Sequence, residues 1–539
     1  MLAVNNTTLE YKPPADASQR LLATDINRSV AVVAPAGSGK TSLLLARFLN
    51  ALISANSPEE VLAITFTNDA ANEIRERVIH QIKSAGNTIN PVAPHEQHVR
   101  NLAVEVHKKD KELDWNLTTN PHRLRIMTID AYCAKLVADM PVSTGIGGSI
   151  KPVDDPRHLY REAVINTLSM ATGSKVNVEI SDCVISVLSY VQYRYESLLA
   201  PMQDLLSKRD QWLLLGRSFN LEDANAFLTN YVESACDDLR SVISSLDGEE
   251  LVADISAASA FSNKLSFFAD YHSLPDASDI EFYQKLTGFL LTGAGTIRKT
   301  FTVRDGIEGD GPSAPRIKEW AKSVNGHPVL EAALQKVQLL PPSVYEGEDL
   351  EFVHSFFKFY ELCIASLIEV FEHYSRCDFT EISLRAHVAL GDDIEGYGDA
   401  LLREDRITHL MVDEMQDTSY AQAVMLEKLV AAWVDDIDKQ RTIAFYGDLQ
   451  QSIYKFRGAE PGLFKKIWMD GVFAGIDLTP LSLTTNFRSG PGLVDHFNDV
   501  FSPLFTGKSD LFIEAESYKE SDTNINYVGY TEGNFEEEA

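Results

Sequence analysis

The stretch VAVVAPAGSGKTSLLLARFL, residues 30–49, decides the fold class of this 539-residue chain. Val30 to Val33 form a short apolar run, a Gly-containing turn follows, and an apolar helical stretch begins at Leu43. A buried strand that runs through such a turn into a helix is typical of a parallel sheet with helical crossovers. The sequence therefore predicts an α/β protein.

The turn between strand and helix predicts a phosphate-binding P-loop, with Ala34 at the position of the usual first Gly. Gly37 and Gly39 let the backbone bend so that successive N–H groups point at phosphate oxygens, at the positive end of a helix dipole. Lys40 is expected on the β- and γ-phosphates and the Thr41 hydroxyl on Mg²⁺. The predicted phosphate-binding residues are Ala34, Pro35, Ala36, Gly37, Ser38, Gly39, Lys40, Thr41 and Ser42.

Further apolar runs, each ending in a polar or Gly-containing turn, predict more strands of the same sheet. They are Val61 to Phe66, Leu124 to Ile129, His409 to Val412 and Thr442 to Tyr446. Between these groups, from about 155 to 375, apolar residues recur at helical spacing. One sheet interrupted by a long, mostly helical insertion is therefore expected.

The run HLMVDE, residues 409–414, brings two adjacent carboxylates to the end of a predicted strand. Asp413 is placed to hold Mg²⁺, and Glu414 to polarise an attacking water. Because the carboxyl ends of parallel strands share one edge, these carboxylates and the P-loop should meet. A Glu directly after the metal-binding Asp favours ATP hydrolysis over phosphoryl transfer.

Composition excludes several classes of protein. With 48 basic and 78 acidic residues the formal net charge is −30, so any polyanion must be bound locally and not by the global field. Five scattered cysteines without a CxxC pair indicate neither a zinc site nor a disulfide framework. Neither a membrane-spanning run nor a secretion leader is indicated, so a cytoplasmic protein is expected.

Four runs together resemble UvrD/Rep-type superfamily 1 DNA helicases. They are TFTNDAANEIRERV (65–78), VDEMQDTSYAQ (412–422), YGDLQQSIYKFRGA (446–459) and NFRS (486–489). The helical insertion and the TIDAYC run (128–133) are most similar to the beta subunit of exonuclease V and to AddA-type helicase-nucleases. This resemblance implies a P-loop RecA-like core at 1–150 and 378–485, a helical insertion at 151–377 facing DNA or a partner, and the start of an incomplete second RecA-like domain at 486–539.

The resemblance also assigns nucleotide contacts outside the P-loop. Gln19 matches the glutamine that reads adenine, and Gln451 the glutamine that senses the γ-phosphate, with Asp448 and Gln416 in the same crevice. Phe487 stands where the family usually stacks a Tyr on adenine. Arg488 matches an arginine that meets the γ-phosphate.

For DNA, the resemblance implies base contacts by aromatic side chains and phosphate contacts by small polar and basic ones, a pattern that tolerates any sequence. The predicted residues are Thr65, Phe66, Thr67, Asn68, Thr128, Tyr454, Phe456 and Arg457. Two positions depart from the family, because Asp69 and Asp130 stand where many relatives have Lys and His. A carboxylate at either place is expected to repel phosphate.

The function implied is that of an ATP- and Mg²⁺-dependent motor on single-stranded or tailed duplex DNA in repair or recombination, moving 3′ to 5′, with a possible partner nuclease or helicase subunit. Residues 1–539 alone are expected to hydrolyse ATP feebly and to unwind no duplex. A second interpretation is a nucleotide-controlled binding module for DNA or a partner, without efficient hydrolysis or translocation. A small-molecule P-loop kinase is a remote third, because no acceptor pocket signature is present.

Overall fold

The computed structural model describes most of the chain. The described residues are 13–85, 94–139, 150–172, 177–215, 221–246, 248–307, 313–392, 396–397, 406–431, 433–434, 439–505 and 512–519. They fall into two compact units. The sheet unit takes in residues 1–170, 194–214 and 362–539, and the helical unit takes in 171–193 and 215–361.

A six-stranded parallel sheet forms the centre of the sheet unit, in the order β12-β1-β9-β8-β2-β3. The strands are β1 (Val30–Val33), β2 (Val61–Thr65), β3 (Arg125–Thr128), β8 (His409–Val412), β9 (Thr442–Gly447) and β12 (Thr479–Ser482). All five predicted strands are therefore present, and the α/β fold class with a helical interruption is confirmed.

Strand β12 was not predicted from the sequence, because its TPLS run contains a proline and alternates little. It pairs with β1 at the edge of the sheet, where Pro480 lies opposite Ala31. An edge strand tolerates a residue without an N–H group, since one side of the strand has no ladder to complete.

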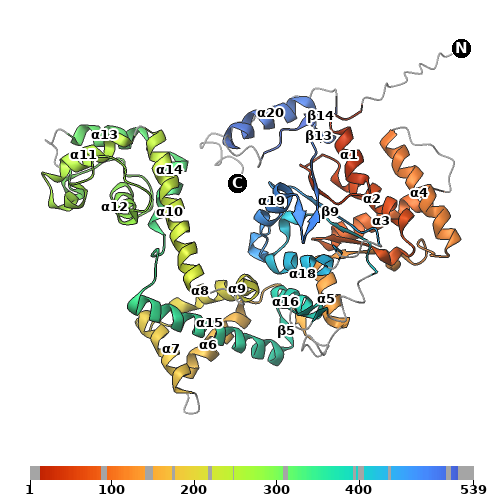
Figure 1. The fold of residues 1–539 in the computed structure, drawn as a ribbon, viewed down its shortest axis with the longest axis horizontal. Coiled ribbons are helices and arrows are strands. Elements are labelled where there is room, and N and C mark those ends of the chain that lie inside the picture. Colours follow the sequence, from red (N-terminus) through yellow and green to blue (C-terminus); the bar gives the residue numbers. More distant parts are fainter. Residues whose placement is uncertain are drawn as a thin grey trace, which may run out of the picture. The chain divides into compact units, whose positions relative to one another are not determined.

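Helices cover both faces of this sheet. Figure 1 shows α1 to α4 (red to orange) on one side and α18 and α19 (blue) on the other. The helices of the sheet unit are α1 (Ala17–Thr24), α2 (Lys40–Ser54), α3 (Asn68–Ser84), α4 (Pro94–Glu112), α5 (Ile129–Asp139), α6 (Arg157–Ser169), α8 (Glu196–Ser207), α9 (Arg209–Leu215), α16 (Phe379–Ala389), α18 (Tyr420–Ala431), α19 (Pro461–Asp470) and α20 (Pro491–Phe501). Short 3-10 turns are η1 (Pro58–Glu60), η2 (Pro121–Arg123), η6 (Met415–Asp417), η7 (Lys455–Arg457) and η8 (Ser502–Phe505).

The core follows from strand alternation. Val30 and Val32 of β1 point to the same face as Ala63 of β2, and this face packs on Leu44 and Phe48 of α2. All five side chains are fully buried. This packing fixes the start of α2 directly beyond the end of β1, which positions the P-loop turn between them.

Two-stranded pairs complete the sheet unit. They are β4 (Lys151–Pro152) with β5 (Arg376–Cys377), β6 (Gly391–Asp392) with β7 (Gly396–Tyr397), β10 (Val472–Phe473) with β11 (Ile476–Asp477), and β13 (Thr485–Asn486) with β14 (Glu516–Ser517). The last pair is parallel and joins the described end of the chain to the segment that follows β12.

The helical unit has its own apolar core, centred on residues such as Phe282, Leu286 and Ile317. Its elements are α7 (Val178–Tyr190), α10 (Leu221–Ser245), α11 (Glu249–Ser259), η4 (Asn263–Phe268), α12 (Ile280–Leu290), η5 (Val303–Asp305), α13 (Ala314–Ser323) and α14 (Pro328–Gln338). The 3-10 turn η3 (Met170–Thr172), helix α9 through its last residue, and helix α15 (Gly347–Tyr374) contribute residues to both units. In its described residues, the insertion predicted from 151 to 377 is mostly helical, as expected, with the short strands β4 and β5 at its two ends, and its limits as a domain stay a prediction.

Candidate nucleotide and DNA site

The P-loop turn has the geometry that its sequence predicts. Gly37 and Gly39 have φ of +83° and +79°, a left-handed conformation that favours glycine. Gly39 is the N-cap of α2, so the first N–H groups of the helix point out of its N-terminal end, toward the turn. Such a turn at a helix N-terminus is suited to binding phosphate.

Lys40 meets the two predicted carboxylates. Its Nζ lies 3.3 Å from Asp413 Oδ1 and 2.5 Å from Glu414 Oε1. Glu414 adopts a positive φ of 56°, which turns the chain sharply at the end of β8. The structure thus brings together the strand ends that carry the P-loop lysine and the acidic pair.

Burial and charge shift two pKa values at this point. Burial acts to lower the pKa of Lys40, but the charges of Asp413 and Glu414 outweigh it, so the pKa of the ammonium is raised. Burial raises the pKa of Asp413, opposed by Lys40 and assisted by Glu414. The cation is therefore held firmly charged, as contact with a triphosphate requires.

Gln416 links Glu414 to the neighbouring strand. It is 1% exposed, its Nε2 donates to Glu414 Oε2 at 2.7 Å, and its Oε1 accepts from the Asp448 N–H at 3.0 Å. Asp448 in turn accepts from Gln451 Nε2 at 2.6 Å and from the Ala36 N–H of the P-loop at 3.1 Å, both through Oδ2. One hydrogen-bonded chain therefore runs from Gln451 to the P-loop and to Glu414.

The segment after β12 lies over the P-loop. The Phe487 N–H donates to the Gly37 carbonyl at 2.8 Å, and Asn486 Nδ2 donates to the Ala36 carbonyl at 3.2 Å. Arg488 is exposed beside them. Phe487 and Arg488 thus lie next to the P-loop turn, and their contacts with nucleotide stay predictions.

Helix α1 borders the same place. Gln19 Oε1 accepts from the Ser482 N–H at 2.9 Å, so its amide oxygen is already bonded and its amide nitrogen is the group left for a base. The guanidinium carbon of Arg20 lies 4.8 Å from the centre of the Phe487 ring. These contacts tie α1 to the segment that carries the predicted adenine-stacking ring.

Asp16 is a site residue that the sequence did not reveal. Its carboxylate accepts from the Thr484 and Thr485 N–H groups, both at 3.0 Å, and binds Arg20. Burial opposes ionisation, but Arg20 and the Thr485 contacts outweigh it and lower the pKa of Asp16. An Asp directly before a helix signals a cap in sequence, and nothing in its spacing points to residues 484 and 485.

The predicted DNA residues gather at a second place, beyond the ends of β2, β3 and β9. The rings of Phe66 and Tyr454 lie 4.4 Å apart and are tilted by 41°. Arg457 Nη2 donates to Asp130 Oδ2 at 3.2 Å, and Gln422 Nε2 donates to Asp130 Oδ1 at 2.8 Å. Phe66 is only 9% exposed, so a base would reach it mainly through movement of its neighbours.

The smaller predicted residues have local structural partners. Thr67 caps α3 by accepting from the Ala70 N–H, and Thr128 accepts from the Ala131 N–H at the start of α5. The Thr65 hydroxyl donates to the Thr67 carbonyl at 3.0 Å. Asn68 is exposed, and the side chain of Phe456 lies outside the described part of the structure. Their DNA contacts stay predictions.

Asp130 was expected to repel phosphate, and its surroundings modify that expectation. Its carboxylate binds Arg457 and Gln422, and burial raises its pKa against these two partners. The negative charge is therefore compensated inside the protein.

Mg²⁺ would find oxygen ligands at this site. The Asp413 carboxylate and the Thr41 hydroxyl are hard oxygen donors of the kind that Mg²⁺ prefers, with phosphate oxygens and water completing its coordination. Among the described residues, no group of three or more His, Cys, Asp or Glu side chains could hold a metal ion.

Every helix in the described ranges is too short or too polar to cross a membrane.

Comparison with known proteins gives one consistent picture. The profile of the UvrD/REP helicase N-terminal domain matches residues 15–470. Curated AddA proteins, each named as one subunit of an ATP-dependent helicase/nuclease, are similar over most of the chain: that of Ruminiclostridium cellulolyticum is 23% identical over 88% of the chain, and that of Exiguobacterium sibiricum is 24% identical over 88%. A Bacillus cereus protein of the same name is 24% identical over 91% of the chain. The chain spans 38% to 39% of the length of these relatives.

Proposed function

The chain belongs to the UvrD/REP helicase family, and on this premise we propose that it binds Mg²⁺-ATP in the P-loop crevice and couples ATP hydrolysis to movement along single-stranded DNA. The observation that carries the proposal is the approach of Lys40 Nζ to Asp413 and Glu414, at 3.3 Å and 2.5 Å. A lysine and two carboxylates at a phosphate-binding turn are the groups that phosphoryl chemistry needs.

Each group has a distinct role. The backbone N–H groups of the turn and Lys40 bind the β- and γ-phosphates, while Asp413 and Thr41 would hold Mg²⁺, which neutralises phosphate charge. Glu414 orients and deprotonates water. Lys40 contacts Glu414 directly, so a γ-phosphate that attracts the ammonium would release that carboxylate for water.

The hydrogen-bonded chain through Gln416 and Asp448 supplies a route for sensing the γ-phosphate. Gln451 donates to Asp448, which also accepts from the P-loop backbone. A phosphate that draws Gln451 toward it would disturb both Asp448 bonds, and through Gln416 the position of Glu414. Gln19 and Phe487 would bind adenine, and Arg488 would approach the γ-phosphate.

For DNA, we propose that bases stack at Phe66 and Tyr454 while Arg457 binds a phosphate. Stacking on an aromatic side chain contributes about 1–3 kcal/mol per base and is independent of base identity, so a motor can step without reading sequence. Gln422, whose side chain donates to Asp130 as Arg457 does, lies in the first turn of α18, and this helix begins at Tyr420, after the 3-10 turn η6 that contains Gln416.

The names of the relatives suggest the wider role. A protein named as one subunit of a helicase/nuclease belongs, by that name, to a larger assembly. We propose that this chain likewise serves DNA repair or recombination on tailed duplex DNA, moves 3′ to 5′, and works with a separate nuclease or helicase chain.

Single-turnover hydrolysis of labelled ATP, with and without oligothymidylate, tests the proposal. DNA should accelerate hydrolysis, and Glu414→Gln should slow it by about 10²- to 10⁴-fold while ATP still binds. Glu460→Gln is the matched control, since Glu460 is exposed and caps α19 in the same unit. Binding of ATP without any hydrolysis by the wild-type chain would favour a nucleotide-controlled binding module instead.

A further inference from the structure

Arg457 lies against two aromatic rings that come from distant parts of the chain. Its guanidinium carbon is 5.2 Å from the centre of the Phe66 ring and 4.8 Å from the centre of the Phe379 ring. A cation over an aromatic face is attracted by the ring quadrupole. The two rings and the bond to Asp130 restrict the orientation of the guanidinium, while 33% of the Arg457 side chain stays exposed.

Phe379 belongs to none of the sequence motifs. It is the first residue of α16, which packs against α5 and α18. Its contact with Arg457 therefore adds a residue from α16 to a site otherwise built from the ends of the sheet strands.

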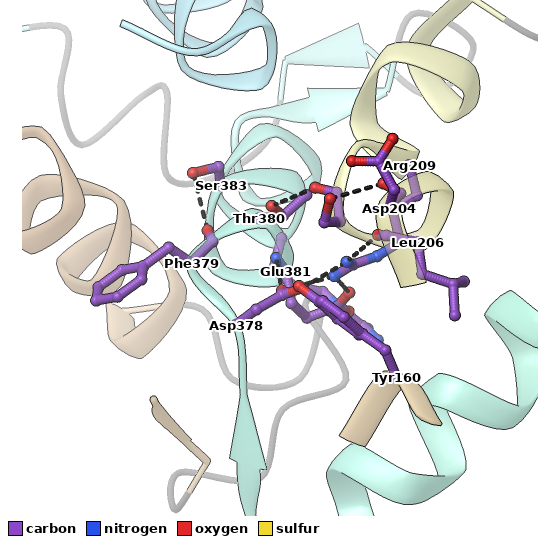
Figure 2. Close-up of polar contacts among 11 residues, drawn as sticks. Tyr160, Asp204, Leu206, Arg209, Asp378, Phe379, Thr380, Glu381 and Ser383 are labelled. Carbon is purple, nitrogen blue, oxygen red and sulfur yellow. Dashed lines mark hydrogen bonds and ion pairs between the residues drawn. The ribbon is translucent and has the colours of Figure 1, made fainter. Parts of the chain in front are cut away.

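A buried ion cluster fixes this end of α16. Asp378, the N-cap residue, accepts from Arg209 at 2.6 Å and 2.7 Å through its two oxygens and from the Tyr160 hydroxyl at 2.5 Å. Arg209 also donates to Glu381 Oε2 at 2.9 Å. Figure 2 shows the Phe379 ring turned away from the side on which Asp378 meets Arg209 and Tyr160.

The buried ion cluster strongly restrains the orientation of the Arg209 and Asp378 side chains. The side chains of Arg209 and Asp378 are 1% and 4% exposed, and their contact is bidentate. A buried pair of this kind contributes little net stability, because desolvation offsets attraction, but its fork geometry allows few arrangements. With Asp378 held, the backbone from which the adjacent Phe379 side chain projects is restrained as well.

We propose that Phe379 is a positioning residue for single-stranded DNA: its ring orients the Arg457 guanidinium so that the N–H groups not used by Asp130 face a DNA phosphate. A guanidinium has five N–H donors, and Asp130 takes one of them. The tilted Phe66 and Tyr454 rings next to it are where bases would stack, so a backbone phosphate would pass close by. The proposal rests on the proposed function, in which Arg457 binds DNA.

Fluorescence anisotropy with labelled oligothymidylate, measured over a range of salt concentrations, tests it. Phe379→Leu keeps apolar volume but removes the aromatic face, and should weaken binding about fivefold. The salt slope should fall by about 0.7, the value of one lost phosphate contact on a single strand. Phe379→Trp keeps an aromatic face and should restore both values. Val388→Ala, at an exposed position of α16, is the control that should change neither.

A double-mutant cycle shows whether Phe379 acts through Arg457. Once Arg457→Ala has removed the guanidinium, adding Phe379→Leu should weaken DNA binding no further. Equal effects of Phe379→Leu with and without Arg457 would overturn the proposal, as would an equal loss of ATP affinity, which would show a general structural role. Wild-type protein that fails to bind the oligonucleotide would overturn the proposed function itself, whereas normal binding by Phe379→Leu would overturn this inference alone.

Discussion

Gly37→Ala tests how the P-loop is joined to residues 486–489. A Cβ at Gly37 would lie 2.7 Å from Asn486 Oδ1, closer than real Cβ contacts, and 3.0 Å from Arg488 Cβ, which is a tight contact. Asn486 Oδ1 already accepts from the Arg488 and Ser489 N–H groups, both at 2.9 Å, so it cannot move without losing those bonds.

The size of the destabilisation expected in Gly37→Ala follows from these contacts. Each backbone hydrogen bond contributes about 0.5–1.5 kcal/mol net, so losing two destabilises the segment by about 1–3 kcal/mol. Gly39→Ala is the matched control: φ is +79°, against +83° at Gly37, so both variants carry a similar backbone strain of about 1–2 kcal/mol. The nearest atom to a Cβ at Gly39 is 3.6 Å away, an ordinary contact with Phe487.

Hydrogen exchange measured by mass spectrometry reports how often residues 486–489 open locally, because a hydrogen-bonded amide exchanges when its bond breaks. The amides of Phe487, Arg488 and Ser489 should exchange about 5- to 150-fold faster in Gly37→Ala than in Gly39→Ala, the ratio that 1–3 kcal/mol implies. Equal exchange in the two variants would show that the segment is not held over the P-loop as the structure describes, and would refute the reasoning.

Two further predictions concern buried polar groups. Burial lowers the pKa of His409 to about 4, so the unfolded chain binds more protons than the folded chain between about pH 4 and 6.5. The free energy of unfolding of wild type should therefore fall by about 2 kcal/mol more than that of His409→Gln when the pH is lowered from about 7.5 to about 5. Urea unfolding measures this, and parallel curves of stability against pH for the two proteins would contradict it. Asp378→Asn removes a negative charge beside the buried Arg209 guanidinium and should lower the free energy of unfolding by about 3–5 kcal/mol. Asp155→Asn, in an exposed ion pair with Arg157, is the control that should leave Tm unchanged. Similar Tm values for the two variants would argue against the buried cluster.

The sequence predicted the elements whose signals are local. Buried parallel strands such as Val30–Val33 and His409–Val412 are continuous apolar runs, and the P-loop needs glycines at positions where the structure has positive φ. The meeting of Lys40 with Asp413 and Glu414 followed from the rule that parallel strand ends share one edge.

What the sequence could not predict depends on contacts between distant segments. Asp16 binds the backbone of Thr484 and Thr485, and Phe379 meets Arg457, yet none of these residues has a spacing that links it to its partner. Asp130 is a further example of a residue whose surroundings the sequence does not show. Taken alone, its carboxylate predicts repulsion of phosphate, but in the structure it binds Arg457 and restricts the orientation of that cation. These side chains acquire their roles only from the tertiary fold.

Calorimetric titration of Mg²⁺-ATP into the wild-type chain and into Lys40→Ala tests the central claim most directly. Lys40 is the cation that both carboxylates hold at the P-loop, and removing it would take away the main side-chain contact proposed for phosphate. Saturable one-to-one binding by wild type, weakened at least about tenfold in a Lys40→Ala protein of unchanged fold, is the predicted result. Equal affinity in the two proteins would contradict the assignment of the nucleotide site.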